Sequence, residues 1–305
     1  MCSRLLALCV ALLLASPAIA QEIVSSVETL EPEDPEAWAM QLFAAISLPT
    51  GLGPPSQLGR GDLSLTGELL QIPHLDQRQR TVGFGGFKEE DLNRSPAAAR
   101  LRAGWGLGGG WTLEGGFAPP VEIDGVEALL LSVAVEKRLW SGPRADGALR
   151  LHGLSGEIKG DLTCTEGADH LFPPGSAENP FGCEAPSNDE MSIESYGLEA
   201  LASWKLRRTE SAPKVFAGVS WTRHETEFQV DALTFGFRDR ALLLAEDDAF
   251  AARLGVSGSW RRSLFGGEVL YAPLDVRRRG EGGRFDPVES DDLVQLRLFW
   301  RLRLR

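Results

Sequence analysis

The sequence predicts an all-β chain that forms a transmembrane, antiparallel, up-and-down β-barrel of about 12 strands, with 10 as the alternative count. The clearest observation is the C-terminal stretch, in which apolar and polar residues alternate to the end of the chain. Similar segments precede it, and an export signal begins the sequence, which together favour a barrel in the bacterial outer membrane. The apolar parity of the last stretch holds Val294, Leu296, Leu298, Trp300, Leu302 and Leu304, and the polar parity holds Gln295, Arg297, Arg301 and Arg303.

The first twenty residues have the features of a secretory signal peptide. Arg4 gives the positive start, residues 5–15 give the short apolar run, and Ala18-Ile19-Ala20 gives a small-residue cleavage site. We therefore expect three parts: a signal peptide over 1–20, an acidic periplasmic N-terminal tail over 21–36, and the barrel over 37–305. A lumen plug is the alternative for the tail.

Alternating segments fill the rest of the chain and give the expected strands in order. Their two parities can be separated in most segments, one apolar and the other repeatedly charged. Glycine-rich pieces weaken the pattern over 82–87, and the count falls to 10 if 63–69 or 82–87 is not a full strand. The expected strands are 38–48, 63–69, 82–87, 101–107, 111–117, 129–139, 148–154, 196–206, 215–228, 250–260, 265–271 and 294–304.

The connections between these strands alternate in length. Those at 108–110, 141–147, 209–213 and 262–264 are short, and those at 88–97, 161–192, 231–248 and 276–292 are long and polar. Short periplasmic turns and long external loops are typical of outer-membrane barrels. Most tryptophans, Trp38 among them, then fall near the periplasmic boundary, and both chain termini are expected on that side.

Charge and cysteine content limit the partners. A net charge of −12 argues against a nucleic-acid partner, because phosphate binding requires a basic surface. The acidic loops suggest outer-membrane lipid and lipopolysaccharide as partners, while oligomeric state and solute stay open. Cys164 and Cys183 are the only cysteines after the signal and should form a disulfide, which would restrict the unfolded chain by roughly 3 kcal/mol. No cofactor or metal site is expected.

Parity also predicts which charged residues line the lumen. They form either a salt-bridge network that fills the barrel or, since arginines outnumber carboxylates, a cationic constriction that favours a small and possibly anionic solute. The function expected is therefore a channel or facilitator, with a structural or adhesion barrel as the alternative. The expected lumen residues are Arg100, Arg102, Glu136, Arg138, Glu199, Arg253, Arg261, Arg297, Arg301 and Arg303.

An enzyme is not expected, because no catalytic set assembles from the sequence. Outer-membrane lipid hydrolases place a histidine and a serine on one face of a strand, but His152 and Ser155 are three apart and so face opposite sides. His224 is followed by Glu225, Thr226 and Glu227 and not by serine. A protease with paired aspartates would need a motif that is absent here.

Two short pieces carry a family resemblance. Ile46-Ser47-Leu48-Pro49-Thr50-Gly51, followed by Gly59-Arg60-Gly61-Asp62-Leu63, resembles the Leu-Pro-Thr-Gly and Gly-x-x-Asp-Leu pieces of the outer-membrane transporter-like family associated with phenol-degradation pathways. The resemblance covers about a tenth of the chain and implies passive transport, but it transfers no substrate or site residue. Pro49 and Gly51 also fit a turn at the end of a first strand.

Overall fold

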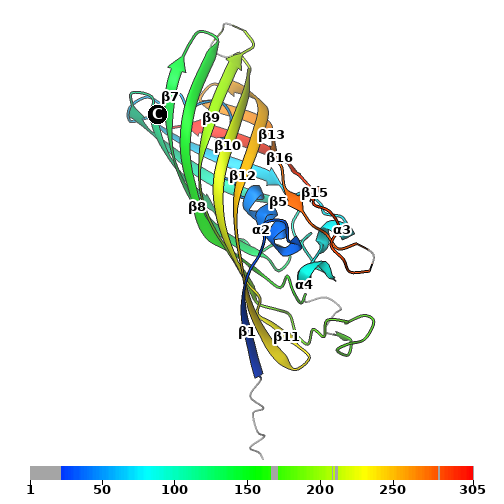
Figure 1. Ribbon diagram of the computed structural model, residues 1–305. Coiled ribbons are helices and arrows are strands. Elements are labelled where there is room, and N and C mark those ends of the chain that lie inside the picture. The colour runs from blue at the N-terminus through cyan, green and yellow to red at the C-terminus, as the bar shows by residue number, and fades with distance from the viewer. Residues whose placement is uncertain (1–21, 166–170, 208, 210–211, 281, 305) are drawn as a thin grey trace, which may run out of the picture.

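Ten strands close into an antiparallel barrel in the described part of the chain (Figure 1). The structure is a computed structural model, and it describes all residues except 1–21, 166–170, 208, 210–211, 281 and 305. Each barrel strand pairs with the next, and the last pairs with the first, which confirms the predicted fold with 10 strands. The strands are β2 (Leu63–Gln71), β5 (Ala97–Gly108), β6 (Trp111–Ala118), β7 (Glu127–Ser141), β8 (Ala145–Gly160), β9 (Asp189–Lys205), β10 (Lys214–Gln229), β12 (Phe237–Trp260), β13 (Ser263–Ala272) and β16 (Leu293–Arg303).

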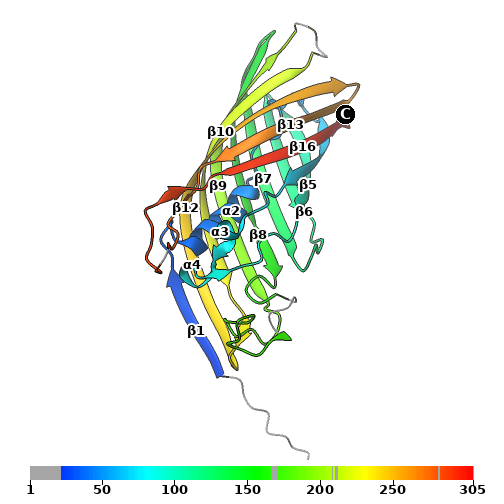
Figure 2. The same cartoon turned by 90° about the vertical axis from the view of Figure 1, so that its right-hand side faces the viewer.

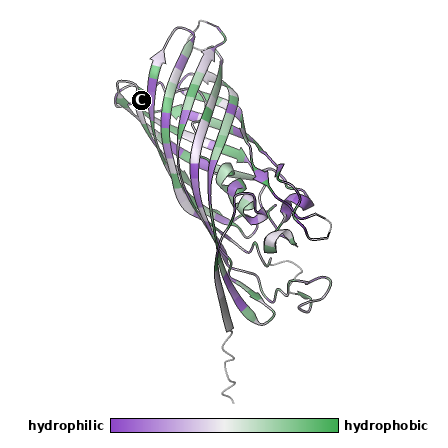
Figure 3. Cartoon of the chain, viewed as in Figure 1, coloured by the Kyte–Doolittle hydropathy of each residue, from purple (hydrophilic) through white to green (hydrophobic). Residues whose placement is uncertain are grey.

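Hydrophobic and hydrophilic residues alternate along the barrel strands (Figure 3), and the exposed ones on the outside are mostly apolar. In β16 the outward Leu296 and Leu298 are 44% and 47% exposed, whereas the inward Gln295 and Arg297 are fully buried. A closed sheet satisfies its own backbone groups, and an apolar outer face suits lipid, so this is an outer-membrane barrel. Among the described residues, no helix is long and apolar enough to cross a membrane.

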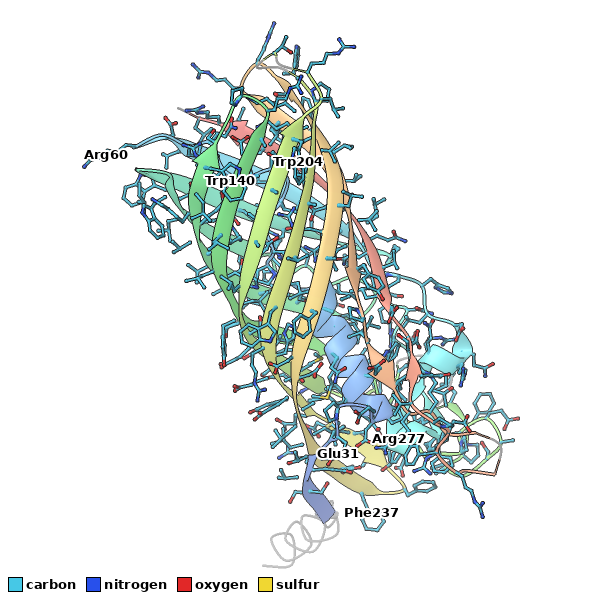
Figure 4. All side chains as sticks on the ribbon, turned by 45° about the horizontal axis from the view of Figure 1, so that its top comes forward. Glu31, Arg60, Trp140, Trp204, Phe237 and Arg277 are labelled. Atoms are coloured by element: carbon cyan, nitrogen blue, oxygen red, sulfur yellow. A yellow bond between two sulfur atoms is a disulfide. The ribbon has the colours of Figure 1, made fainter. Side chains whose placement is uncertain are left out.

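The two ends of the barrel differ, as predicted. The short-turn end carries the connections 109–110, 142–144, 206–213 and 261–262, and Figure 4 shows Trp140 and Trp204 near it. The long-loop end carries 72–96, 119–126, 161–188, 230–236 and 273–292. The small elements α3 (Gln77–Arg80), β3 (Thr81–Val82), α4 (Gly83–Gly86), β4 (Lys88–Glu89), β11 (Ala232–Thr234), β14 (Asp275–Val276) and β15 (Glu289–Ser290) lie in these long connections.

The predicted disulfide is present in the connection between β8 and β9. Cys164 and Cys183 are bonded, with their Cα atoms 5.7 Å apart, and both are buried. The bond closes the loop that the sequence identified as the longest.

Three predicted elements are wrong. Residues 38–48 do not form a strand, because helix α2 (Pro35–Ile46) occupies that stretch and crosses the predicted boundary at 36/37. Residues 82–87 form no barrel strand, because Phe84, Gly85 and Gly86 all have positive φ angles that interrupt extended backbone. Residues 237–248, expected in a loop, instead extend β12 to 24 residues.

The N-terminal segment is also not a tail on the same side as the C-terminus. Strand β1 (Glu22–Thr29) pairs in parallel with residues 237–244 of β12 at the long-loop end (Figures 1 and 2). Arg303 lies at the opposite, short-turn end, so the described chain enters the barrel from the long-loop side. The plug alternative for residues 21–36 is also wrong for β1, because the helix in the lumen begins only at Pro35. The predicted signal peptide lies outside the described residues.

Candidate functional site

Helix α2 fills the lumen next to the long-loop end. Asp34 stands at the N-cap position, Pro35 occupies the first turn, and ten of the twelve helical residues are buried. The helix packs on inward side chains from opposite sides of the ring, which places it inside the barrel. These wall residues are apolar and include Leu70, Leu130, Leu154, Met191, Ile193, Leu270 and Leu293.

After α2 the chain continues as an extended segment, residues 47–58, that follows the lumen towards the short-turn end. An extended segment inside a barrel has backbone groups with no partner of their own, so the wall must supply hydrogen bonds. Arginines donate to its carbonyl oxygens: Arg100 to Ser47 at 2.8 Å, Arg102 to Thr50 at 2.7 Å, and Arg301 to Leu52 at 2.7 Å. Longer contacts join Arg150 to Pro49, Arg253 to Gly53 and Arg138 to Ser56.

Carboxylates of the wall accept hydrogen bonds from the backbone N–H groups of the same segment. Gly51 N–H donates to Glu199 at 2.7 Å, Ser56 N–H donates to Glu136 at 2.6 Å, and Gly53 N–H makes a longer contact of 3.4 Å with Glu268. The wall thus contacts both kinds of backbone group along residues 47–56. We call this segment together with α2 the plug, and we call the arginines and glutamates that hold it the ladder.

The ladder residues are also paired with one another, either between neighbouring strands or across one intervening strand. Glu68 lies 2.7 Å from Arg102, and Glu114 bridges Arg102 at 3.2 Å and Arg150 at 2.6 Å. Arg253 bridges Glu199 at 2.5 Å and Glu268 at 2.9 Å. Such buried ion pairs gain little net free energy, but removing one partner leaves a buried charge alone and is strongly destabilising.

The structure places most of the predicted lumen residues on the ladder. Arg100, Arg102, Glu136, Glu199, Arg253 and Arg297 are buried inside the barrel, and Arg138 and Arg301 are partly buried and contact the plug. Arg261 and Arg303 do not line the lumen. Arg261 lies exposed in the turn after β12, over the Trp260 ring, and Arg303 lies exposed at the short-turn rim.

Sequence reasoning missed Glu68 as a ladder residue, and it missed the contacts that Arg297 makes with Thr50 of the plug and with Gln295. The signal for Glu68 was present, because Ser64, Thr66 and Glu68 share one parity of β2 opposite Leu65 and Leu69. Parity placed Gln295 beside Arg297, and the two side chains lie 2.7 Å apart, but Thr50 could not be found in this way, because Arg297 reaches it, at 2.9 Å, only with the plug inside.

The two pieces that carried the family resemblance have distinct structural roles. Residues 48–51 cross the lumen in the ladder and do not form the turn that a first strand would need. Residues 59–62 form a turn into β2, in which the Asp62 carboxylate accepts the Gly59 N–H at 2.6 Å. That hydrogen bond, with the nearby Arg303 guanidinium, lowers the pKa of Asp62.

Little space is left where the plug and ladder meet. The cavity bounded by Gly51, Pro54, Glu114, Arg150 and Arg301 measures about 10 Å³, at the lower limit for one water molecule. The salt-bridge network expected as one of two alternatives therefore fills this part of the lumen together with the plug.

A much larger pocket of about 580 Å³ lies at the long-loop end, between β1, α2 and the ends of β9, β10 and β12. Apolar side chains make up most of its wall, notably Met40, Phe43, Met191, Phe228 and Leu243. Its ionisable groups are mainly carboxyl groups: Glu28, Asp34, Glu36, Glu90 and Asp239, with Arg279 as the one basic side chain among the described lining residues. Burial raises the pKa of Glu36, against the opposing effect of the hydrogen bond it accepts from Gly85 N–H.

Two long connections cover this pocket and are tied together by Arg279. Its guanidinium lies between the rings of Phe87 and Phe285, at 4.3 and 4.1 Å from their centroids. The same group donates to the carbonyl oxygens of Gly85 and Gly283. The Arg279 charge is thus engaged by rings and carbonyls of the cover (residues 81–89 and 277–288) and is not directed into an open channel.

Comparison with known proteins finds similarity only in overall shape. No family model matches the chain, and no curated protein matches it. The phenol-pathway resemblance therefore stays a prediction.

Within the described residues, no group of three or more His, Cys, Asp or Glu side chains could hold a metal ion.

Solved structures with a similar arrangement are outer-membrane barrels of several kinds. The translocator domain of the autotransporter NalP from Neisseria meningitidis is 10% identical, over 90% of this chain and 99% of that one, with a TM-score of 0.37. The outer-membrane protease OmpT from Escherichia coli is 9% identical, over 80% and 91%, with a TM-score of 0.36. The toluene transporter TodX from Pseudomonas putida is 9% identical, over 83% and 70%, with a TM-score of 0.34. At these values no function is carried over, and the architecture rests on the strand pairing of the chain itself.

Proposed function

We propose that this protein is an outer-membrane facilitator for a small amphipathic organic solute whose head group is neutral or cationic. The observation that carries the proposal is the pocket of about 580 Å³ that ends on the plug. Its size and mostly apolar wall, with a few polar groups, are typical of small-molecule sites. We take the long-loop end to be the external side, as the lengths of the connections indicate.

The charge of the pocket decides the class of head group. Carboxylates dominate its polar wall, and Arg279 is already held between two rings. An anion placed there would meet the carboxylates of Glu28 and Asp34, whereas an ammonium group could pair with them and a hydroxyl group could donate to them. The lumen arginines, which suggested an anionic solute, donate hydrogen bonds to the plug. In this proposal they therefore keep the plug in place and do not select the solute.

Passage along the barrel axis requires the plug to move. The ladder holds residues 47–56 through their backbone, and the residual cavity at that level measures about 10 Å³. The proposed cycle is therefore solute binding in the pocket, displacement of the plug, and release at the short-turn end.

A structural or adhesion barrel is the second candidate. The filled lumen favours it, because a permanently seated plug would give stability and no path. The extension of β12 beyond the barrel, where it pairs with β1, also offers an external surface. A lipid hydrolase is the third and weakest candidate, since Ser155 faces outward while His152 is buried inside. Outer-membrane lipid and lipopolysaccharide remain the expected partners.

Binding of a matched series tests the proposal. Octylamine, octanol and octanoate share one tail and differ in head charge, and each is titrated calorimetrically into the full chain in lipid nanodiscs. We expect octylamine and octanol to bind more tightly than octanoate. The pocket-filling change Ala241→Trp should abolish binding, while Ala252→Trp, on the lipid face of the same strand, should leave it intact. Flux of the bound solute into liposomes completes the test.

Specific outcomes would overturn the proposal. Binding of octanoate alone, or binding that survives Ala241→Trp, would show that the pocket is not the site. Binding without flux under any condition would favour the structural barrel.

A further inference from the structure

Four polar side chains lie in the lumen wall between the ladder and the pocket. They are His152 on β8, Ser195 on β9, and Thr222 and His224 on β10, and they are 5%, 7%, 0% and 3% exposed. All four point into the barrel by strand parity. Neither the ladder nor the pocket uses them.

Gly197 of β9 leaves room for side chains from the two neighbouring strands, β8 and β10, to reach each other. His152 and Thr222 are its partners in the sheet, and the His152 Nε2 atom lies 3.2 Å from Thr222 Oγ1 above the glycine. A Cβ at residue 197 would come within 2.7 Å of that nitrogen and 2.6 Å of that oxygen. One step towards the long-loop end, His224 stands beside Ser195, its partner in the sheet.

Most polar atoms of this cluster have no hydrogen-bond partner. His152 Nδ1, Ser195 Oγ and both ring nitrogens of His224 are buried and unpaired. A neutral imidazole can remain in such a place at modest cost. An imidazolium cannot, because a buried charge without a partner is far more costly than a buried dipole.

The groups around His152 would do little to stabilise an imidazolium there. His152 faces Arg150 of its own strand, Arg102 of β5, Glu199 of β9 and His224. Glu199 already accepts from Arg253 and from the plug at Gly51, so it is committed.

The remaining charged groups lie beside His224. Its partner in the sheet on β12 is Asp247, and the next residue, Asp248, lies on the outer face and acts on it only through its charge; His224 has no hydrogen bond to either. Helix α2 packs against β10 and β12, and the only titratable residue within it is Glu36 in its first turn.

We infer that His152 and His224 form an acid-sensitive latch on the plug, neutral when the plug is seated and protonated when it is displaced and water enters. For each proton that only the displaced state takes up, the ratio of displaced to seated plug rises tenfold for every unit by which the pH falls. The inference rests on the proposed function only in treating the plug as the gate.

Hydrogen exchange of the plug tests the latch without using transport. The full chain in lipid nanodiscs is measured at about pH 7.5 and about pH 5, which span the range where an ordinary histidine titrates. Exchange rates of residues 37–58 are corrected for the intrinsic effect of pH. Protection of the plug should fall about tenfold or more at the lower pH in the natural chain. It should change less than about twofold in the double variant His152→Gln/His224→Gln. His74→Gln, on an exposed loop, is the matched control and should behave as the natural chain does.

Each other outcome is decisive. Unchanged protection in the natural chain overturns the latch, and increased protection at low pH would mean that His224 pairs with Asp247 and strengthens the seal. If the double variant cannot seat the plug at either pH, the single variants decide, and each should show a smaller pH response than the natural chain. A pH response of the plug without solute flux would sink the facilitator and leave the latch standing.

Discussion

Residues 35–46 and 47–56 are consecutive and both lie inside the barrel, yet the walls around them have opposite chemistry. Around the helix the wall is leucine, isoleucine, methionine and alanine. Around the extended segment it is mainly arginine and glutamate, with Phe216 and Phe299 packed on Leu52. The lipid-facing side of the same strands is apolar at both levels, so the change concerns only the lumen.

Backbone hydrogen bonding explains the difference. A helix satisfies most of its own N–H and C=O groups, so its apolar side chains can meet an apolar wall and gain from burial. An extended segment satisfies none of its own groups, and each one left unpaired in a buried place would cost about 1–3 kcal/mol. The conformation of the plug therefore dictates the composition of the barrel around it.

Removing one ladder arginine should have the largest effect. Arg102→Leu leaves Glu68 and the Thr50 carbonyl without their donor and leaves Glu114 with Arg150 alone, and we expect a loss of about 3–5 kcal/mol in the free energy of unfolding. Urea unfolding of the purified barrel measures it. Arg60→Leu, on an exposed residue just before β2, should change stability by less than about 0.5 kcal/mol. Equal effects of the two changes would show that a ladder arginine contributes no more to stability than an exposed arginine.

The opposite change at the helix level should be nearly as damaging. Leu42→Asn has almost the same shape but puts an unpaired amide into the apolar wall, and we expect a loss of about 2–4 kcal/mol. Leu42→Met, which keeps the site apolar, should cost less than about 1.5 kcal/mol. If asparagine were tolerated as well as methionine, the wall around α2 would contain water, and the contrast between the two levels would fail.

A pair of glycines sharpens the view of how closely the ladder fits the extended segment. Gly53 and Gly61 both have positive φ angles, 77° and 82°, so alanine is strained at either. At residue 53 a Cβ would also lie 2.7 Å from the ring of Phe299, whereas at residue 61 it meets nothing within 4 Å. Gly53→Ala should therefore cost about 1–2 kcal/mol more than Gly61→Ala. Adding Phe299→Leu should recover part of that difference, and no recovery would place the strain elsewhere.

These two levels also show what the sequence could and could not predict. Strand β16 was found because its outer face meets lipid, so apolar residues and arginines alternate from Leu296 to Arg303 except at Phe299. Residues 38–48 were assigned wrongly because a segment surrounded by wall is apolar on all sides and shows neither period clearly. Asp34 and Pro35 were available as helix start signals.

The inward direction of the ladder side chains could be predicted, but their partners could not. Parity places charged side chains inside a barrel, but it does not say whether they meet water, one another or a second segment. What decides this is the fate of residues 47–58, whose partners lie as far along the chain as Arg253 and Arg301. The surplus of arginines thus suggested a path for anions. In the structure, several of these side chains donate hydrogen bonds to the carbonyl groups of the plug.

The last expected effect concerns the cover of the pocket, which contrasts with both levels of the lumen because it meets water. Burial raises the pKa of Glu90 to about 8, although the ammonium of Lys88, 2.5 Å away, opposes the shift. The folded cover therefore binds a proton that the unfolded chain, with a usual value of 4.5, gives up. This contribution to stability is full below about pH 4.5 and is lost as the pH rises through about 8. Hydrogen exchange of residues 81–92 should accordingly show a cover that loosens between those values, and Glu90→Gln should remove the dependence. Glu122→Gln, on an exposed loop residue, should keep it. The plug is expected to loosen in the opposite direction, with acid, so a cover and plug that respond together would show that one titration controls the whole long-loop end.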